Sequence, residues 1–220
     1  MVGMNSPELV AELPHPAVLL ERCRSLAVLD AIFAGRERTY AFDPAWGDGV
    51  ALASMDNGGG DLYAVVFDPA GVFLYGFDHE CDATPWREDD RVHWPGLLDG
   101  LPPALARYAA EPAFQLDGFF DATVCAWRET GDDAWRCGPV VFEDGESDGA
   151  DFLFEQLLDA DGTAYADWAE DIFERPVDRA AVAAVFSGAA LTPELVHQLN
   201  PEADYEEIAR EAAALGRRIP

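Results

Sequence analysis

Strand patterns fill the middle of the chain, and helix patterns lie on both sides of them. Residues 62–67 (LYAVVF) and 72–77 (VFLYGF) are short apolar runs typical of buried strands, and the turn at 68–71 predicts that they form a hairpin. Further strands are predicted near 38–42, 49–55, 123–129 and 134–142. Because these strands cluster instead of alternating with long helices, the pattern predicts an α+β fold with a mostly antiparallel sheet.

Helix patterns occupy the two ends of the chain. Residues 15–34 carry apolar side chains at three- and four-residue steps, with Pro16 at the start and Gly35 at the end, as expected of an N-terminal helix. Two short helices are predicted at 93–102 and 103–110. The region after Gly149 reads as entirely helical, with helices predicted at 150–159, 163–174, 178–187, 193–199 and 204–215.

These elements predict a single α+β domain over residues 1–220. The acidic stretch 143–151 (EDGESDGAD) is the best candidate for a subdomain boundary, placed near 143–150, with a helical C-terminal region over 150–215. We find no internal repeat and no low-complexity linker that would favour two separate domains.

The charge balance excludes several functions. The 220 residues include 42 acids and 14 bases, so the formal net charge is −28, and every base is an arginine. Binding to nucleic acid needs a basic surface that neutralises phosphate, and binding to an anionic membrane surface needs one too. The sequence therefore predicts no nucleic-acid partner and no membrane partner. Disorder is disfavoured because half of the residues are hydrophobic.

The ends of the chain and its cysteines favour a cytoplasmic protein. The first twenty residues have no basic segment followed by an apolar one, as a secretion signal would have, and no run is long and apolar enough to span a membrane. The cysteines are widely spaced and form no C-x-x-C pair, so we expect reduced thiols without a metal: Cys23, Cys81, Cys125 and Cys137.

The densest polar cluster follows the second strand of the predicted hairpin. If that strand continued, Asp78, Glu80 and Asp82 would share one face, where three carboxylates repel one another unless a cation or a basic partner joins them. Three more acids follow at 88–90. We therefore predict a contact with a basic partner at Asp78, Glu80, Asp82, Glu88, Asp89 and Asp90. The alternatives are a metal site that uses Asp78, His79, Glu80 and His93, and a solvated loop without a ligand.

Known catalytic and cofactor motifs are missing from the sequence. There is no G-x-S-x-G nucleophile motif, and the glycines at 58–60 lack the lysine of a phosphate-binding loop and precede a strand instead of a helix. Cys125 and His197 are best explained as structural residues. We therefore predict no catalytic residue and no cofactor, and the sequence favours a protein that is not an enzyme.

Residues 55–67 carry a motif that is similar to one family. The turn Asn57-Gly58-Gly59-Gly60-Asp61 with the strand after it, then Gly71-Val72-Phe73 and Asp78-His79-Glu80, resembles the central motif of the SMI1/KNR4-like (SUKH) superfamily, whose pattern is N-G-G-G-D-x-[YW]. The predicted helix 15–34 stands where that family has its first helix, so the resemblance covers about residues 15–80. The chain as a whole is also similar to proteins of GC-rich bacteria.

Two parts of the chain depart from the family pattern. The stretch 94–98 (WPGLL) stands where the family has a short closing helix, and residues 122–220 extend beyond the common domain. The resemblance implies an α+β fold and, in bacteria, an immunity protein that binds and neutralises a toxin, often a nuclease. It transfers no catalytic residue. It implies only that Asn57, Gly58, Gly59 and Asp61 are structural turn residues.

Three functions are compatible with these observations. The first is a non-enzymatic acidic interaction protein, such as a bacterial immunity protein, whose charge attracts a basic nuclease-type toxin. The second is a metal-dependent enzyme or a metal-binding protein that uses the acids and histidines of 78–93. The third is a domain whose acidity only confers solubility in its host.

Overall fold

The computed structural model describes residues 3–35 and 37–220. Their contacts define two compact units, and each unit is built from two separate segments of the chain. The first unit contains the segment that ends at Leu13 together with Ala45–Phe154, and the second contains Pro14–Pro44 and Glu155–Pro220.

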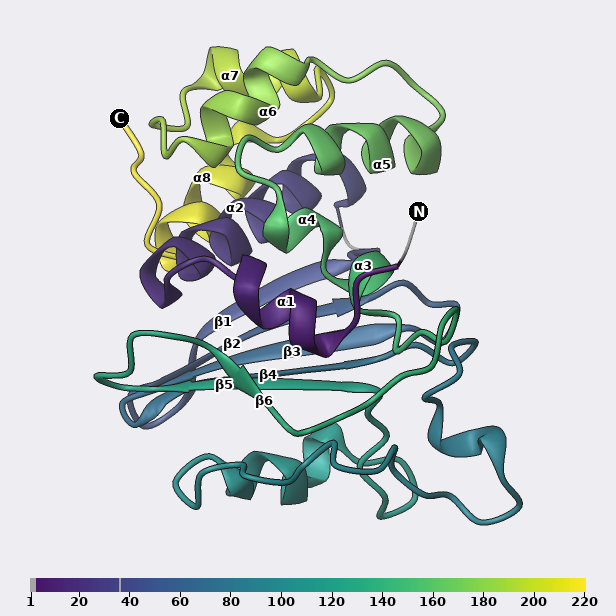
Figure 1. The fold of residues 1–220 in the computed structure, drawn as a ribbon. Helices are drawn as coiled ribbons and strands as arrows, with labels where there is room; N and C mark the ends of the chain where they lie inside the picture. Colours follow the sequence, from purple (N-terminus) through teal and green to yellow (C-terminus); the bar gives the residue numbers. More distant parts are fainter. Residues whose placement is uncertain (1–2, 36) are drawn as a thin grey trace. The chain divides into compact units, whose positions relative to one another are not determined.

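A six-stranded sheet is the largest element of the fold (Figure 1). Its strands follow one another in chain order, and the pairs from β2 to β6 are antiparallel. The predicted α+β class with a mostly antiparallel sheet is therefore confirmed. The strands are β1 (Tyr40–Gly47), β2 (Val50–Asp56), β3 (Leu62–Asp68), β4 (Gly71–Phe77), β5 (Val124–Glu129) and β6 (Arg136–Cys137).

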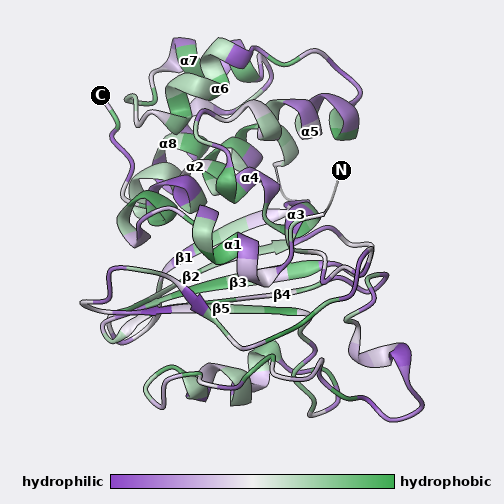
Figure 2. Cartoon of the chain, in the orientation of Figure 1, coloured by the Kyte–Doolittle hydropathy of each residue, from purple (hydrophilic) through white to green (hydrophobic). Residues whose placement is uncertain are grey.

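The predicted hairpin lies at the centre of the sheet. β3 and β4 pair from Leu62 opposite Phe77 to Asp68 opposite Gly71, and every residue of β4 is buried. Figure 2 shows the hydrophobic colour concentrated on β3, β4 and β5. A strand between two others, with both of its faces covered, loses the apolar–polar alternation of a half-exposed strand. This burial explains the continuous apolar run at 72–77.

Two different layers cover the two faces of the sheet in the first unit (Figure 1). The short helices α1 (Ser6–Glu12) and α3 (Ala150–Leu153) lie on one face. Residues 78–122 cover the other face and contain three 3₁₀ helices, η1 (Pro85–Arg87), η2 (Ala106–Ala110) and η3 (Pro112–Phe114). The core on this second face contains Phe73, Tyr75, Leu97, Leu105, Tyr108, Phe114, Phe120 and Trp127.

The second unit is helical apart from the first residues of β1. Its central helix α2 (Pro16–Ala34) has buried residues around most of its circumference, because the other helices pack around it. Within the described residues, no helix combines the length and the apolar character needed to cross a membrane. The surrounding helices are α4 (Glu155–Leu158), α5 (Thr163–Phe173), α6 (Arg179–Phe186), α7 (Pro193–Leu199) and α8 (Tyr205–Ala214).

A buried carboxylate ties α2 to the chain that follows it. Asp30 accepts hydrogen bonds from the backbone N–H groups of Thr39 (2.7 Å) and Tyr40 (3.0 Å). Burial raises the pKa of Asp30, although these hydrogen bonds oppose the shift. The carboxylate is therefore a buried acceptor that fixes the path from α2 into β1.

Two predicted helices are wrong. Residues 93–102 form turns in which Gly96 and Gly100 have positive φ angles, and only Ala106–Ala110 of the second segment is helical, as a 3₁₀ helix. A positive φ cannot continue a right-handed helix, so the two glycines break the pattern that the apolar spacing suggested.

The predicted strand at 134–142 is also mostly wrong, because only Arg136–Cys137 pairs with β5. A Cβ atom on Gly138 would lie 1.9 Å from the carbonyl oxygen of Gly96, so the backbone of this segment packs tightly against the turn at 96 instead of extending the sheet. Pro139 follows, and proline cannot donate a ladder hydrogen bond.

Some helices and strands differ from the predicted ones in number or in length. α1 is absent from the prediction, and the predicted helix 150–159 is divided into α3 and α4. The first strand runs over Tyr40–Gly47 instead of 38–42. The helices predicted at 15–34, 163–174, 178–187, 193–199 and 204–215 are confirmed within one or two residues at each end.

Candidate functional site

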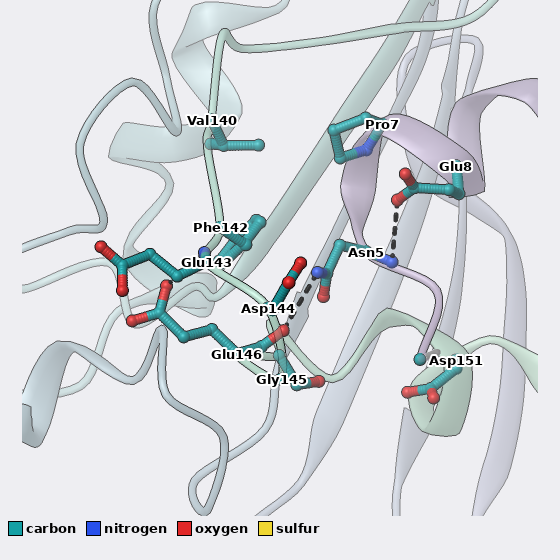
Figure 3. A pocket seen from close by; sticks show the side chains of 12 residues that line it. Asn5, Pro7, Glu8, Val140, Phe142, Glu143, Asp144, Gly145, Glu146 and Asp151 are labelled. Carbon is teal, nitrogen blue, oxygen red and sulfur yellow. Dashed lines mark hydrogen bonds between the residues drawn. The ribbon is translucent and has the colours of Figure 1, made fainter. Parts of the chain in front are cut away.

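A pocket lined by carboxylates lies in the first unit, between the N-terminal segment and the loop 143–151 (Figure 3). Its volume is about 780 Å³. We call it the acidic pocket, and its lining residues are Gly3, Asn5, Pro7, Glu8, Val140, Phe142, Glu143, Asp144, Gly145, Glu146, Ser147 and Asp151.

Local hydrogen bonds hold the acidic pocket in shape. The Glu8 carboxylate accepts the backbone N–H of Asn5 at 3.2 Å, which is one half of a capping box at the start of α1. The Asn5 side chain reaches the loop, where it donates to the carbonyl of Glu146 at 3.2 Å (Figure 3). It also accepts the N–H of Asp148 at 3.0 Å. The Glu146 carboxylate accepts the N–H of Glu143 at 2.8 Å. The two walls are therefore joined through Asn5.

None of the arginines that the structure describes neutralises the acidic pocket. Its five carboxylates take part in no ion pair with any residue that the structure describes: Glu8, Glu143, Asp144, Glu146 and Asp151. Like charges this close raise the free energy of the folded state, and a cationic group brought among them would lower it.

The arginines of the first unit all have other partners. Arg91, Arg107 and Arg136 form ion pairs with Asp121, Asp68 and Asp132. The remaining two donate to backbone carbonyls: Arg87 to Thr84, Val92 and His93, and Arg128 to Asp132. The positive charges of this unit are therefore used within the fold and leave the acidic pocket uncompensated.

Apolar side chains accompany these acids. Pro7, Val140 and Phe142 line the pocket itself. Val141 and Phe152, the sequence neighbours of Phe142 and Asp151, have 77% and 56% of their surface exposed. The acidic pocket therefore combines carboxylates with apolar side chains, so it offers both electrostatic attraction and apolar contact to a partner.

A buried carboxylate anchors the same loop. Asp148 accepts hydrogen bonds from the N–H of Ser6 (2.7 Å), the hydroxyl of Ser6 (2.5 Å) and the N–H of Ala150 (3.0 Å). Burial raises the pKa of Asp148 to about 6 in spite of these hydrogen bonds. Asp148 thus links the start of α1 to the start of α3.

The predicted partner-binding acids lie in two places. Asp82 accepts the N–H of Ser147 at 2.9 Å, so the first part of the segment 78–90 contacts the loop of the acidic pocket. Asp78 is half-buried and caps the N–H of Glu80, while Glu80 is exposed. Glu88, Asp89 and Asp90 are exposed and form no ion pair among the described residues. The segment after β4 is not a strand, so the expected common face of Asp78, Glu80 and Asp82 does not form.

The acids of the pocket were not predicted as site residues. The sequence predicts the acidic stretch 143–151 as a boundary, although its acid content is itself a signal of a charged site. Glu8 had no such signal, because its place in the site depends on contacts between residues more than 140 positions apart.

The predicted turn residues form a hydrogen-bonded turn. Asn57 Oδ1 accepts the N–H groups of Gly59 (2.7 Å) and Asp61 (3.2 Å), and Asn57 Nδ2 donates to the Asp61 carboxylate at 2.7 Å. Gly58 has a φ of 70°, a conformation that glycine adopts without strain. This turn fixes Asp61 beside the segment after β4.

Asp61 meets His79 and Asp78 at this turn. His79 Nδ1 lies 2.7 Å from the Asp61 carboxylate, which also accepts the N–H of His79 at 3.1 Å. The side-chain hydrogen bond to Asp61 raises the pKa of His79. Partial burial acts to raise the pKa of Asp61, but the hydrogen bonds from His79 and Asn57 outweigh it, so this pKa is lowered.

These three side chains are the residues that could hold a metal. One ligand atom from each of Asp61, Asp78 and His79 lies within 4.8 Å of the others. The predicted set of Asp78, His79, Glu80 and His93 is not this group. Glu80 Oε1 lies 3.9 Å from the other ring nitrogen of His79, Nε2, and His93 Nε2 bonds to the carbonyl of Phe120 at 2.6 Å. Metal binding at His79 Nδ1 requires loss of the proton that this nitrogen shares with Asp61.

The thiols are poor nucleophiles. Burial raises the pKa of Cys81 to about 12 and also raises the pKa values of Cys23, Cys125 and Cys137. A thiol attacks as the thiolate, which a raised pKa disfavours near neutral pH. All four are free of disulfide bonds.

The fold and the site define an acidic α+β protein with an antiparallel sheet and an uncompensated carboxylate-lined pocket. Comparison with protein families, curated proteins and solved structures finds no match to this chain.

Proposed function

We propose that the protein is a non-enzymatic interaction protein of the cytoplasm that binds a basic protein partner, and that the acidic pocket is the contact. The observation that carries this proposal is the set of five carboxylates that no arginine of the first unit neutralises. The partner class that the SMI1/KNR4-like resemblance implies is a nuclease-type toxin, whose phosphate-binding surface is basic.

Long-range attraction supports the same proposal. A net charge of −28 creates a negative potential that raises the encounter rate with a cationic protein. The exposed apolar side chains that neighbour pocket residues in the sequence, Val141 and Phe152, would then help to hold the complex, because burial of apolar surface stabilises an interface.

The test compares two variants with equal changes of charge. One replaces three pocket acids (E143Q, D144N and E146Q), and the control replaces three exposed acids of the segment 78–90 (E88Q, D89N and D90N). Each variant is used as bait in extracts of the source cell at low and high salt, and the captured protein is identified and purified. The association rate of that partner is then measured.

We expect the wild type and the control to retain one basic protein at low salt. The pocket variant should lose it, with an association rate about tenfold lower or more. Capture of no basic protein at low salt would contradict the proposed function. Equal association by the two variants would contradict the pocket as the contact, and loss in the control alone would place the contact at Glu88, Asp89 and Asp90.

A second candidate function is metal binding, and the group of Asp61, Asp78 and His79 is the observation that favours it. Two carboxylates and one imidazole suit zinc or manganese. The test is elemental analysis of the purified protein, followed by thermal unfolding with each divalent metal. A metal that binds the folded state should raise the melting temperature of the wild type and not of H79Q, whereas a flat melting temperature across metals would remove this candidate.

A further inference from the structure

A second pocket of the first unit has an aromatic lining. Its volume is about 650 Å³, within the usual range of small-molecule sites. It lies at the end of the sheet where β3 begins and β4 ends, with walls from η1 and η3. We call it the aromatic pocket, and its lining residues are Asp56, Gly60, Leu62, Tyr75, Phe77, His79, Trp86, Ala113, Phe114, Gln115, Leu116 and Asp121.

Exposed apolar side chains lie at this pocket. Trp86 and Leu116 have 52% and 57% of their surface exposed, and both line it. Tyr75, Phe77 and Phe114 are buried and supply further aromatic surface. Large apolar side chains left in contact with water cost free energy that a bound apolar group would recover.

The hydroxyl of Tyr75 faces the same pocket. Tyr75 is only 4% exposed and lines the pocket, yet no described residue forms a hydrogen bond with its hydroxyl. Its ring is fixed by Phe114 and Phe120, with centroid distances of 5.1 and 4.8 Å. The oxygen is not one of the fully buried unpaired atoms of the described residues, so water reaches it from the pocket, and a polar atom of a ligand could replace that water.

The charges around the aromatic pocket favour a cation. Asp121 is already paired with Arg91, and the Asp61 carboxylate is paired with His79. Asp56 is exposed, lines the pocket and has no cationic partner among the described residues. It is therefore the carboxylate available to a ligand, in a protein whose overall field attracts positive charge.

The Arg91 side chain shows that cations are stable beside these aromatic groups. Its guanidinium lies 4.3 Å from the ring centroid of Trp86, which lines the pocket, and 4.8 Å from that of Phe119, which does not. Such contacts stabilise a cation through the negative face of the ring. A ligand with a positive charge would find the same chemistry on the remaining aromatic surface.

We propose that the aromatic pocket binds a small organic cation, an amine that carries an aromatic ring. The ring would lie among Phe77, Trp86 and Phe114. The ammonium group would pair with Asp56, and a polar atom of the ligand would bond the Tyr75 hydroxyl. This site is separate from the acidic pocket, so the proposal does not rest on a protein partner.

The test uses three indole probes that differ in charge. Tryptamine is a cation at about pH 8, tryptophol is neutral and indole-3-acetate is an anion. Their affinities for the full chain are measured by isothermal titration calorimetry. Tryptamine should bind about tenfold or more tightly than tryptophol, and indole-3-acetate should not bind. Equal affinities for the three probes would overturn the proposal.

Three variants locate the binding. Y75F keeps the ring and removes the hydroxyl, and it should weaken tryptamine binding about fivefold or more. D56N should weaken it about tenfold, whereas D89N removes one equally exposed charge outside the pocket and should leave the affinity unchanged. Unaltered binding in Y75F and D56N, or an equal loss in D56N and D89N, would show that the amine responds only to the general field and would overturn the proposal.

Discussion

At the scale of single residues, a few buried or paired carboxylates hold the first unit together. Asp148 joins α1 to α3, and Asp61 joins the turn at 57–61 to His79. The sequence predicted the turn, because Asn57 and the glycines after it have one evident local use. It could not predict Asp148, since its partner Ser6 lies 142 residues away.

The pKa of Asp148 predicts a pH-dependent stability. Because this pKa is raised to about 6, the carboxyl of Asp148 binds a proton more tightly in the folded state than in the unfolded state. Its contribution to the free energy of unfolding is therefore largest at low pH and is lost as the pH rises through 6. A pKa shift of this size corresponds to about 3 kcal/mol of the free energy of unfolding. Urea unfolding of the wild type and D148N between pH 4 and 7 measures it.

The quantity to compare is the difference in free energy of unfolding between the wild type and D148N, because other carboxylates also titrate in this range. The free energy of unfolding of the wild type should fall relative to that of D148N as the pH rises from 4 to 6. A constant difference across this range would contradict the raised pKa.

The pair of Asp61 and His79 predicts a second measurable shift. In an NMR titration of the wild type, the pKa of His79 should lie above its ordinary value of 6.5, because the Asp61 carboxylate stabilises the imidazolium. D61N removes that charge and should lower the pKa of His79, whereas D89N should leave it unchanged. Identical titration curves for D61N and the wild type would refute this role of Asp61.

At the scale of elements, the sequence predicted helices and strands correctly only where contacts between near neighbours in the chain determine them. Helix α2 was predicted because Pro16 and Gly35 mark its ends, and the β3–β4 hairpin because two apolar runs flank a short turn. The predictions for 93–110 and 134–142 were wrong because tight backbone packing at Gly96 and Gly138 fixes the conformation of these segments. The spacing of apolar residues does not reveal such packing.

Gly76 illustrates an element contact that can be tested. A Cβ atom at this position would lie 2.7 Å from Leu153 Cδ1 and 2.8 Å from the Phe154 ring, so β4 allows this close approach only because residue 76 is glycine. G76A should lower the free energy of unfolding by about 1–3 kcal/mol through overpacking. Chemical denaturation measures this loss.

A double-mutant cycle provides the control for Gly76. L153A creates space at the contact, so G76A should cost less in the L153A background than in the wild type. Additive losses would show that the contact between β4 and α3 is not the cause.

At the scale of the whole molecule, the acid excess sets the behaviour of the protein in salt. The composition predicted this charge, but not its local arrangement, because the fold decides which acids meet an arginine. The unpaired acids of the pocket come from the N-terminal segment and from the loop 143–151, and only folding places them together.

Repulsion among these charges predicts that salt stabilises the fold. Added sodium chloride shortens the Debye length from about 10 Å at 0.1 M to about 3 Å at 1 M. The melting temperature of the wild type should therefore rise over this range, and it should rise less for the E143Q, D144N and E146Q variant. A melting temperature that is independent of salt would contradict uncompensated repulsion in the fold.

The interleaving of the two units has a consequence for synthesis on the ribosome. Helix α2 has buried residues around most of its circumference, whereas α6 and α8, which pack against it, belong to the segment Glu155–Pro220, which is synthesised later. Its apolar surface must therefore stay uncovered until the segment Glu155–Pro220 has been translated. A nascent chain of this kind is expected to depend on a chaperone that shields apolar helices during translation.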